Sequence, residues 1–169
     1  NASTMFTNSG ILKIGSTDPI GLQGIRMFSG SKFINNSGAH LEIDSTGQNA
    51  IQLLSLGTNF TNGGSILIGD KFLVGSSGIS QSGTGSSFLN QTNGFMQINR
   101  SSTGLLLFTN TNFSNSGIIE IGNVVGIRGT GLSQSSSSIF TNQIGAILKI
   151  NLTGVGVTTG HGIALSSSA

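Results

Sequence analysis

Apolar and polar residues alternate with a period of two in short segments along the whole chain. Lys13, for example, lies between Leu12 and Ile14. Residues two apart on a strand share a face, so this pattern predicts strands with one buried face. Glycine, asparagine, serine and threonine separate the segments, and no stretch has a helical period. We therefore expect an all-β chain without helix. The six alternating segments are 12–14, 41–43, 66–68, 96–98, 119–121 and 148–150.

These segments belong to a repeat that begins with phenylalanine, any residue and asparagine. The motif occurs six times, about 27 residues apart, and each copy is followed by a glycine and a strand that ends in isoleucine. Six copies in the same order indicate one repeated structural unit. The phenylalanines are Phe6, Phe33, Phe60, Phe88, Phe113 and Phe140; the asparagines are Asn8, Asn35, Asn62, Asn90, Asn115 and Asn142; and the isoleucines are Ile14, Ile43, Ile68, Ile98, Ile121 and Ile150.

Odd and even copies of the repeat differ, so the full unit is a pair of about 53 residues. The asparagine and the isoleucine are six positions apart in odd copies and eight apart in even copies. Odd copies continue from isoleucine to glycine, as at Gly15, whereas even copies continue to Asp or Asn, as at Asp44. A less regular apolar segment, such as residues 51–54, follows in each copy.

A repeat of this length cannot bury its own strands when it is alone, but it can do so when it stacks on neighbouring copies. If each copy forms one coil, parallel strands pair at about 4.8 Å and equal residues lie above one another. We therefore predict a single domain over residues 1–169, a right-handed parallel β-helix of six coils. Phenylalanine, asparagine and isoleucine should form internal ladders. Each asparagine should bond to the asparagines above and below it and to the backbone of its turn.

Charged residues provide a test of this alignment. Lys13 and Glu42 fall in one outward column on neighbouring coils, and so do Glu120 and Lys149. Opposite charges side by side contribute about 0.2 to 1 kcal/mol per pair. The predicted stacking should bring both pairs into contact.

Low charge and the absence of cysteine narrow the functions open to the chain. The chain has seven Lys and Arg residues and five Asp and Glu residues, and the basic residues do not cluster. We therefore expect no nucleic-acid binding. The longest apolar runs, such as 105–108, are far too short to span a bilayer, and we expect no membrane insertion. Neither a disulfide framework nor a cysteine metal site is available.

Side chains that could perform catalysis or bind a metal are sparse. Glu42 and Asp44 lie near one corner with Asp70, where a calcium or paired-carboxylate site is conceivable and a solvated polar corner is the preferred interpretation. His40 and His161 belong to distant coils, and we expect both at surface or turn positions. We therefore predict no enzyme, no cofactor and no metal. A polysaccharide lyase or hydrolase is the least favoured alternative, because it needs clustered acids.

The pattern Phe-x-Asn-x-Gly-x-Leu-x-Ile-Gly resembles the repetitive β-helix segments of large bacterial cell-surface and secreted proteins, above all those of the Bacteroidetes. It is more distantly similar to filamentous-haemagglutinin-type adhesins. The resemblance covers nearly the whole chain and implies an extracellular or cell-surface location and a passive stalk, adhesion or fibre role. Asp44-Ser45-Thr46 also resembles the O-glycosylation sequon of the Bacteroidetes, although a simple turn is the better interpretation.

Two functional hypotheses follow from this sequence. In the first, the chain is a stalk segment or filament subunit whose uncapped ends stack head to tail, or a segment of a longer array. In the second, it binds a surface glycan or ice. We favour the first, because the outward column after phenylalanine is mixed and the chain has no Trp or Tyr on which sugars could stack. That column reads Thr7, Ile34, Thr61, Leu89, Ser114 and Thr141.

Overall fold

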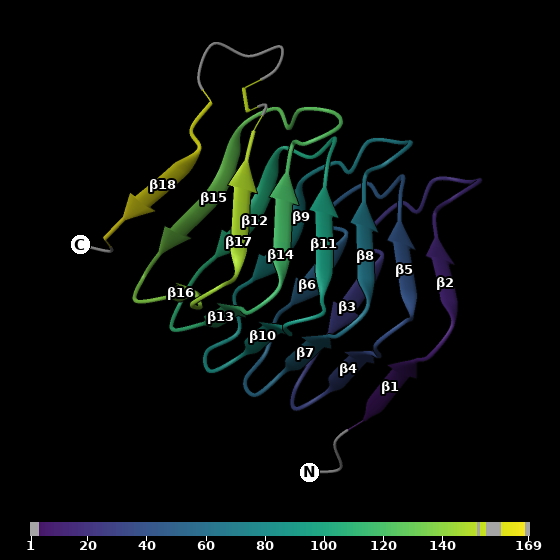
Figure 1. Cartoon of the computed structure of the whole chain (residues 1–169), viewed down its shortest axis with the longest axis horizontal. Helices are drawn as coiled ribbons and strands as arrows, with labels where there is room; N and C mark the ends of the chain where they lie inside the picture. The colour runs from purple at the N-terminus through teal and green to yellow at the C-terminus, as the bar shows by residue number, and fades with distance from the viewer. Residues whose placement is uncertain (1–3, 152, 155–159, 168–169) are drawn as a thin grey trace.

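The computed structural model describes residues 4–151, 153–154 and 160–167, and all regular structure in them is β-strand. The chain winds through six coils, and each coil adds one strand to each of three parallel sheets (Figure 1). Coil one contains the first three strands of the chain, coil two the next three, and so on to coil six. The predicted all-β solenoid of six coils of about 27 residues is confirmed. None of the described residues forms a helix that could cross a membrane.

The first sheet contains the phenylalanine and asparagine motifs. Every strand of this sheet ends at the asparagine, which places the asparagine side chain at a corner of the coil. In their order across the sheet, the strands are β1 (Met5–Asn8), β4 (Lys32–Asn35), β7 (Asn59–Asn62), β10 (Ser87–Asn90), β13 (Asn112–Asn115) and β16 (Ile139–Asn142).

The second sheet contains the alternating segments. In coil two, Leu41 and Ile43 point inward and are fully buried. The strands of this sheet, in their order along the solenoid, are β2 (Ile11–Ile14), β5 (His40–Ile43), β8 (Ser65–Ile68), β11 (Phe95–Ile98), β14 (Ile118–Ile121) and β17 (Ile147–Ile150).

The less regular segments form a complete third sheet. Its sequence pattern is weak because an inward column that holds leucine in even coils holds glutamine in coils three and five: Leu53, Gln81, Leu107 and Gln134 are aligned. The strands of this sheet are β3 (Ile25–Met27), β6 (Ile51–Leu53), β9 (Ser77–Gln81), β12 (Thr103–Leu107), β15 (Thr130–Ser135) and β18 (Ile163–Ser166).

Equal residues of successive coils are aligned, and the aligned apolar columns fill the interior. Phe33 pairs with Phe60, and Ile43 pairs with Ile68. The side chains of Phe60, Ile68 and Ile79 are almost completely buried. Each such burial contributes about 1.5 to 3 kcal/mol before chain entropy is subtracted. The middle coils are therefore the most strongly packed, because they have neighbours on both sides.

The corners between sheets alternate in length from coil to coil. Between the first and second sheets, the corner is short in coil one, at residues 9–10, and longer in coil two, at residues 36–39. Between the second and third sheets the order is reversed in coils one to five: the corner is longer in coil three, at residues 69–76, than in coil four, at residues 99–102. Coil six departs from this order, because its segment between β17 and β18 spans residues 151–162. Successive strands stay in register in all three sheets despite these differences. A pair of coils is thus the structural unit.

Candidate functional site

The asparagine ladder runs along the corner between the first and second sheets. Asn8 Nδ2 donates to Asn35 Oδ1 at 2.8 Å, Asn35 Nδ2 donates to Asn62 Oδ1 at 2.8 Å, and the series continues to Asn142. Each amide also donates to a backbone carbonyl, as from Asn35 Nδ2 to Ser65 O at 3.1 Å. This second bond ties each asparagine to the backbone of a following strand or turn. The predicted ladder, including its bonds to the turn backbone, is confirmed.

All the side-chain bonds of this ladder point in the same direction along the solenoid. In every one, the asparagine of the earlier coil donates and that of the later coil accepts. At the C-terminal end, Asn142 Nδ2 donates to Ala146 O at 3.1 Å, and its second hydrogen has no acceptor among the described residues. At the N-terminal end, Asn8 Oδ1 accepts from Gly10 N at 3.2 Å, and its second acceptor position is unused within the same part of the chain. The two ends of the ladder are complementary.

The phenylalanine rings form a continuous stacked column beside the asparagines. The ring centroids of Phe60 and Phe88 are 4.6 Å apart and the rings are nearly parallel, with an interplanar angle of 5°. At the ends the stack loosens: the centroids of Phe113 and Phe140 are 5.3 Å apart, with an interplanar angle of 27°. Phe6, which has a ring neighbour on one side only, is 51% exposed.

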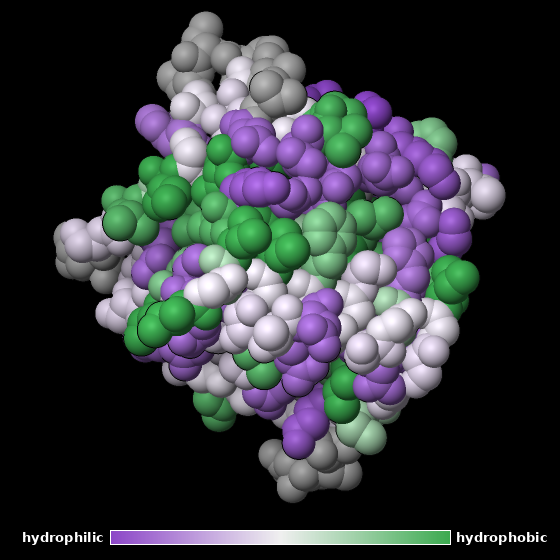
Figure 2. Space-filling view, viewed as in Figure 1, coloured by the Kyte–Doolittle hydropathy of each residue, from purple (hydrophilic) through white to green (hydrophobic). Residues whose placement is uncertain are grey.

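Strand edges and apolar side chains are exposed at both ends of the solenoid. The strands β1 to β3 at one end and β16 to β18 at the other each pair with a single neighbour. Ile11 is 74% exposed and Leu165 is 72% exposed. On the face drawn in Figure 2, hydrophobic side chains gather over β11, β14 and β17, toward the C-terminal end. Unpaired edges with apolar side chains favour the addition of further strands.

Glu42 is the centre of a charged cluster on the second sheet. Its carboxylate lies 2.8 Å from Lys13 Nζ and 3.1 Å from Lys71 Nζ, and only 4% of the residue is exposed. The hydrogen bond from Lys13, together with that from Lys71, lowers the pKa of Glu42 to about 2 against the opposing effect of burial. The predicted contact of Glu120 with Lys149 also forms, at 2.8 Å.

Asp44 lies at the next corner and is completely buried. Its Oδ1 accepts a hydrogen bond from Lys71 N at 3.2 Å, whereas Oδ2 has no partner among the described residues. Burial raises the pKa of Asp44, and the nearby Glu42 and Asp70 carboxylates act in the same direction. The equivalent residue of coil four is Asn99, whose Oδ1 accepts from Val124 N at 3.3 Å. Both side chains therefore anchor the corner of the following coil.

The solvated polar corner expected around Glu42, Asp44 and Asp70 is wrong for the first two residues. Both are buried, and their carboxylates are engaged by lysines and by backbone N–H groups. In the part of the chain that the structure describes, no group of three His, Cys, Asp or Glu side chains is placed to hold a metal ion. This corner is a structural joint between three coils.

The two histidines lie far apart in different environments. His161 is exposed and outside any strand, as expected. His40 differs from the expectation of a turn, because it begins β5 and is half-buried. Its Nδ1 lies 2.8 Å from Ser65 Oγ in the next coil, and its Nε2 lies 3.7 Å from the carboxylate of Glu42. His40 belongs to the charged cluster of the second sheet.

Two other sequence features are also located by the structure. The column after each phenylalanine is in register, so that Thr7 pairs with Ile34 and Ile34 with Thr61, and it alternates hydroxyl and apolar side chains as far as Ser114. Thr46, the last residue of the resembled sequon, is 3% exposed and donates its hydroxyl to Gln48 O at 3.0 Å. The turn interpretation explains this residue.

Three residues with structural roles escaped the sequence interpretation. Lys71 completes the cluster around Glu42 from the longer corner of coil three. Gln81 is buried and donates from Nε2 to Ser86 O at 2.8 Å and to Asn112 O at 3.0 Å, and Gln134 donates to Ser138 O in coil five. The spacing Ile79 to Gln81, repeated at Leu132 to Gln134, is a signal that could have identified the glutamines.

Comparison with known protein families, with curated proteins and with solved structures finds no match for this chain.

Proposed function

We propose that this chain is a structural repeat unit of a bacterial cell surface, a stalk segment or filament subunit that extends by stacking one coil on the next. The observation that carries the proposal is the match between the two ends of the solenoid. Coil six carries the longer first corner of an even coil, at residues 143–146, and coil one carries the shorter corner of an odd coil. A second copy placed on coil six therefore continues the alternation of the corner between the first and second sheets.

The apolar columns also continue across such a junction. Phe140 would stack on Phe6 of the second copy, and Ile150 would pack on its Ile14. All four side chains are only partly covered or exposed in the isolated solenoid. Their equivalents in the middle coils are fully buried, and completing that burial supplies part of the usual 1.5 to 3 kcal/mol, roughly, for each large side chain. The junction thus reproduces contacts that the molecule already makes internally.

The asparagine ladder supports one direction of stacking. Head-to-tail contact brings the free amide hydrogen of Asn142 to the free acceptor position of Asn8 in the second copy. Head-to-head contact would instead place two donors or two acceptors opposite each other, which leaves buried polar groups unpaired. A head-to-tail contact does not close, so it generates a filament.

Sedimentation velocity over a series of protein concentrations, followed by electron microscopy, tests this proposal. We expect species that grow with concentration and thin unbranched fibres. A chain that remains monomeric at every concentration and forms no fibres would refute head-to-tail stacking.

The variant Ile11→Pro sharpens this test. Gly10 O and Ile14 O accept hydrogen bonds from coil two, and backbone groups alternate in direction along a parallel strand, so the N–H of Ile11 faces the open end. Proline removes that donor and is tolerated on an edge strand. Ile11→Ala keeps the donor and serves as the matched control. We expect Ile11→Pro to be a folded monomer and Ile11→Ala to assemble. Equal assembly of the two variants would exclude this edge as the interface.

The surface location is supported by the resemblance of the repeat to surface-protein β-helices. Protease treatment of intact cells that produce the chain tests it. Degradation before lysis is the expected result, and protection until the cells are broken would contradict an external location.

The alternative function is a carbohydrate-binding module. The observation that favours it is a hollow on coil four that is lined by Arg100 and Arg128. Ice binding is favoured less, because apolar side chains interrupt the column of hydroxyl groups at Ile34 and Leu89. A thermal-hysteresis measurement addresses ice binding directly.

A further inference from the structure

Alternation of the corners hollows the edge of the solenoid between the second and third sheets. Coil four has a short corner there, at residues 99–102, and lies between the longer corners of coil three, at residues 69–76, and coil five, at residues 122–129. The chain of coil four is therefore set back between two projecting loops. We name the hollow the coil-four trough. It has a cavity volume of about 260 Å³ and is lined by Leu73, Arg100, Val125, Gly126 and Arg128.

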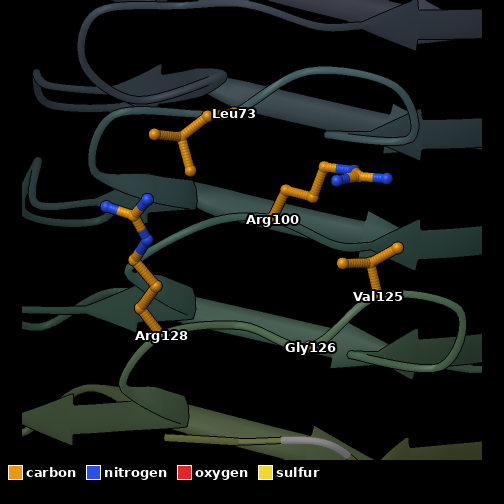
Figure 3. A pocket seen from close by; sticks show the side chains of 5 residues that line it. All are labelled: Leu73, Arg100, Val125, Gly126 and Arg128. Carbon is orange, nitrogen blue, oxygen red and sulfur yellow. The ribbon is translucent and has the colours of Figure 1, made fainter. Parts of the chain in front are cut away.

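The trough combines two cationic side chains with apolar ones. In Figure 3, Arg128 extends from coil five toward Leu73 of coil three, while the guanidinium of Arg100 lies on the side of Val125. The two positive charges thus lie at different places along the trough. Leu73 is 41% exposed, which provides an apolar surface beside the guanidinium groups.

Neither arginine is neutralised by a neighbouring acid. Among the described residues, no carboxylate oxygen lies within 4.0 Å of a nitrogen of Arg100 or Arg128. Arg100 Nε donates to Asp70 O at 3.1 Å, which orients its guanidinium and leaves its terminal nitrogens for another partner. The lysines Lys13, Lys71 and Lys149, by contrast, are all paired with glutamates.

We propose that the coil-four trough binds an acidic polysaccharide. Arg100 and Arg128 would pair with carboxylate or sulfate groups on neighbouring sugars, and Leu73 and Val125 would cover the apolar face of the sugar between them. Guanidinium groups bind planar carboxylates and sulfates through two parallel hydrogen bonds, which makes arginine suited to such groups.

Two features favour an acidic glycan over other ligands. Proteins that hold double-stranded nucleic acid through its backbone commonly neutralise about six to ten phosphates, far more than two arginines can. Neutral sugars are usually held on Trp or Tyr platforms, which this chain lacks. A polymer with regularly spaced acidic groups fits two separated cations that each have an apolar side chain nearby.

The repeat itself supplies a natural comparison. Ser45 of coil two directly follows Asp44, as Arg100 directly follows Asn99. Both residues have a left-handed backbone, with φ of 48° at Ser45 and 43° at Arg100. The corner therefore has this conformation with serine as well as with arginine. Arg100→Ser should remove the charge and leave the corner intact.

The test measures binding of three fluorescent oligosaccharides of equal length: oligogalacturonate, its carboxyl-reduced neutral form and a sulfated oligosaccharide. The Ile11→Pro background or a low protein concentration keeps the chain monomeric, so the result does not depend on stacking. We expect binding of the oligogalacturonate, of the sulfated chain or of both, and much weaker binding of the neutral form. The double variant Arg100→Ser, Arg128→Gln should weaken binding about tenfold, the effect of losing two exposed charged contacts.

Lys32→Gln, which removes one charge from the first sheet, is the matched control and should leave binding unchanged. Circular dichroism melts confirm that each variant is folded. The proposal is overturned if neither acidic oligosaccharide binds, if the neutral form binds equally well, or if Lys32→Gln weakens binding as much as the double variant. Tighter binding of a DNA duplex through the same two arginines would assign the trough to nucleic acid instead.

Discussion

At Asp44 the chain buries a carboxyl group that has one hydrogen-bonded oxygen and one without a partner among the described residues. The equivalent position of coil four holds asparagine, which makes the same kind of bond to the following coil without a charge. Burial raises the pKa of Asp44 above the value of about 3.8 that it has in the unfolded chain. Ionisation of Asp44 at neutral pH therefore opposes folding.

Asp44→Asn should accordingly stabilise the protein. The folded state favours the protonated acid, so its penalty is absent below about pH 3.8 and grows as the pH rises through the folded pKa. We expect the variant to gain on the order of 1 kcal/mol in unfolding free energy at pH 7 and nothing near pH 3. Denaturant unfolding at both pH values measures this difference. A loss of stability at pH 7 would show that the carboxylate is needed as an anion.

Glu42 behaves in the opposite way, because its pKa is lowered to about 2 by Lys13 and Lys71. Its stabilising effect is complete above the unfolded value of about 4.5 and is lost as the pH falls toward 2. Glu42→Gln should therefore lower the unfolding free energy by about 1 to 2 kcal/mol at pH 7. This loss is smaller than the full pKa change implies, because both lysines are half exposed and solvent screens their charges.

Glu120→Gln is the matched control for that variant, since Glu120 contacts a single lysine. We expect Glu120→Gln to lower the unfolding free energy by less than half as much as Glu42→Gln, when both variants are measured by denaturant unfolding at pH 7. Equal losses would mean that Lys71 adds nothing to the cluster.

Sequence reasoning at the scale of single residues succeeded where the repeat specified a column. The pairs of Lys13 with Glu42 and of Glu120 with Lys149 followed from alignment alone. Lys71 could not be predicted, because it comes from a corner whose path no repeated residue specifies. The burial of Asp44 was also missed, because a polar residue at the end of a strand normally indicates solvent.

On the scale of the elements, each strand of the first sheet depends on its asparagine for the polar groups of the corner. Asn62 accepts from Asn35 Nδ2 and donates to Asn90 Oδ1 and Phe95 O. Its removal leaves one amide hydrogen of Asn35 and the Oδ1 atom of Asn90 without a partner in a fully buried place. Each unpaired buried group costs about 1 to 3 kcal/mol.

Asn62→Ala should therefore lower the unfolding free energy by roughly 3 to 5 kcal/mol, allowing for partial relaxation of the corner. Asn142→Ala is the control, because Asn142 is exposed and ends the ladder. We expect a cost below about 1.5 kcal/mol for the control, measured by denaturant unfolding. Similar costs at both positions would argue that the ladder does not stabilise the middle of the solenoid.

The elements were predicted to different degrees. The first and second sheets could be identified because their inward residues repeat with little variation. The third sheet was visible only as an irregular segment, since Gln81 and Gln134 interrupt its apolar column and their amides replace apolar packing by hydrogen bonds to the backbone. The coil-four trough could not be predicted, because it depends on how far neighbouring corners project.

The proposed filament, considered as a whole molecule, contains one unfavourable contact at each junction. Lys149 ends an outward column and Lys13 begins it, so stacking places two lysines on neighbouring coils. Each remains beside its glutamate, which limits the repulsion, and added salt screens the remainder. Head-to-tail assembly should therefore strengthen modestly with ionic strength.

Lys149→Gln removes this repulsion and should assemble at lower concentration than the natural chain and with less dependence on salt. Sedimentation velocity at low and high ionic strength measures both effects. Lys32 lies in coil two on the first sheet and is not part of the junction, so Lys32→Gln should assemble as the natural chain does. Weaker assembly of Lys149→Gln would mean that the two lysines do not meet.

The alternation of corners has a consequence for how such a molecule changes size over evolutionary time. Between the first and second sheets, insertion of one coil would place two corners of the same kind in succession, whereas insertion of two coils restores the alternation found along the whole solenoid. Duplications in the gene should thus persist in pairs of coils. Because each coil adds about 4.8 Å, the length of such solenoids would grow in increments of about 10 Å.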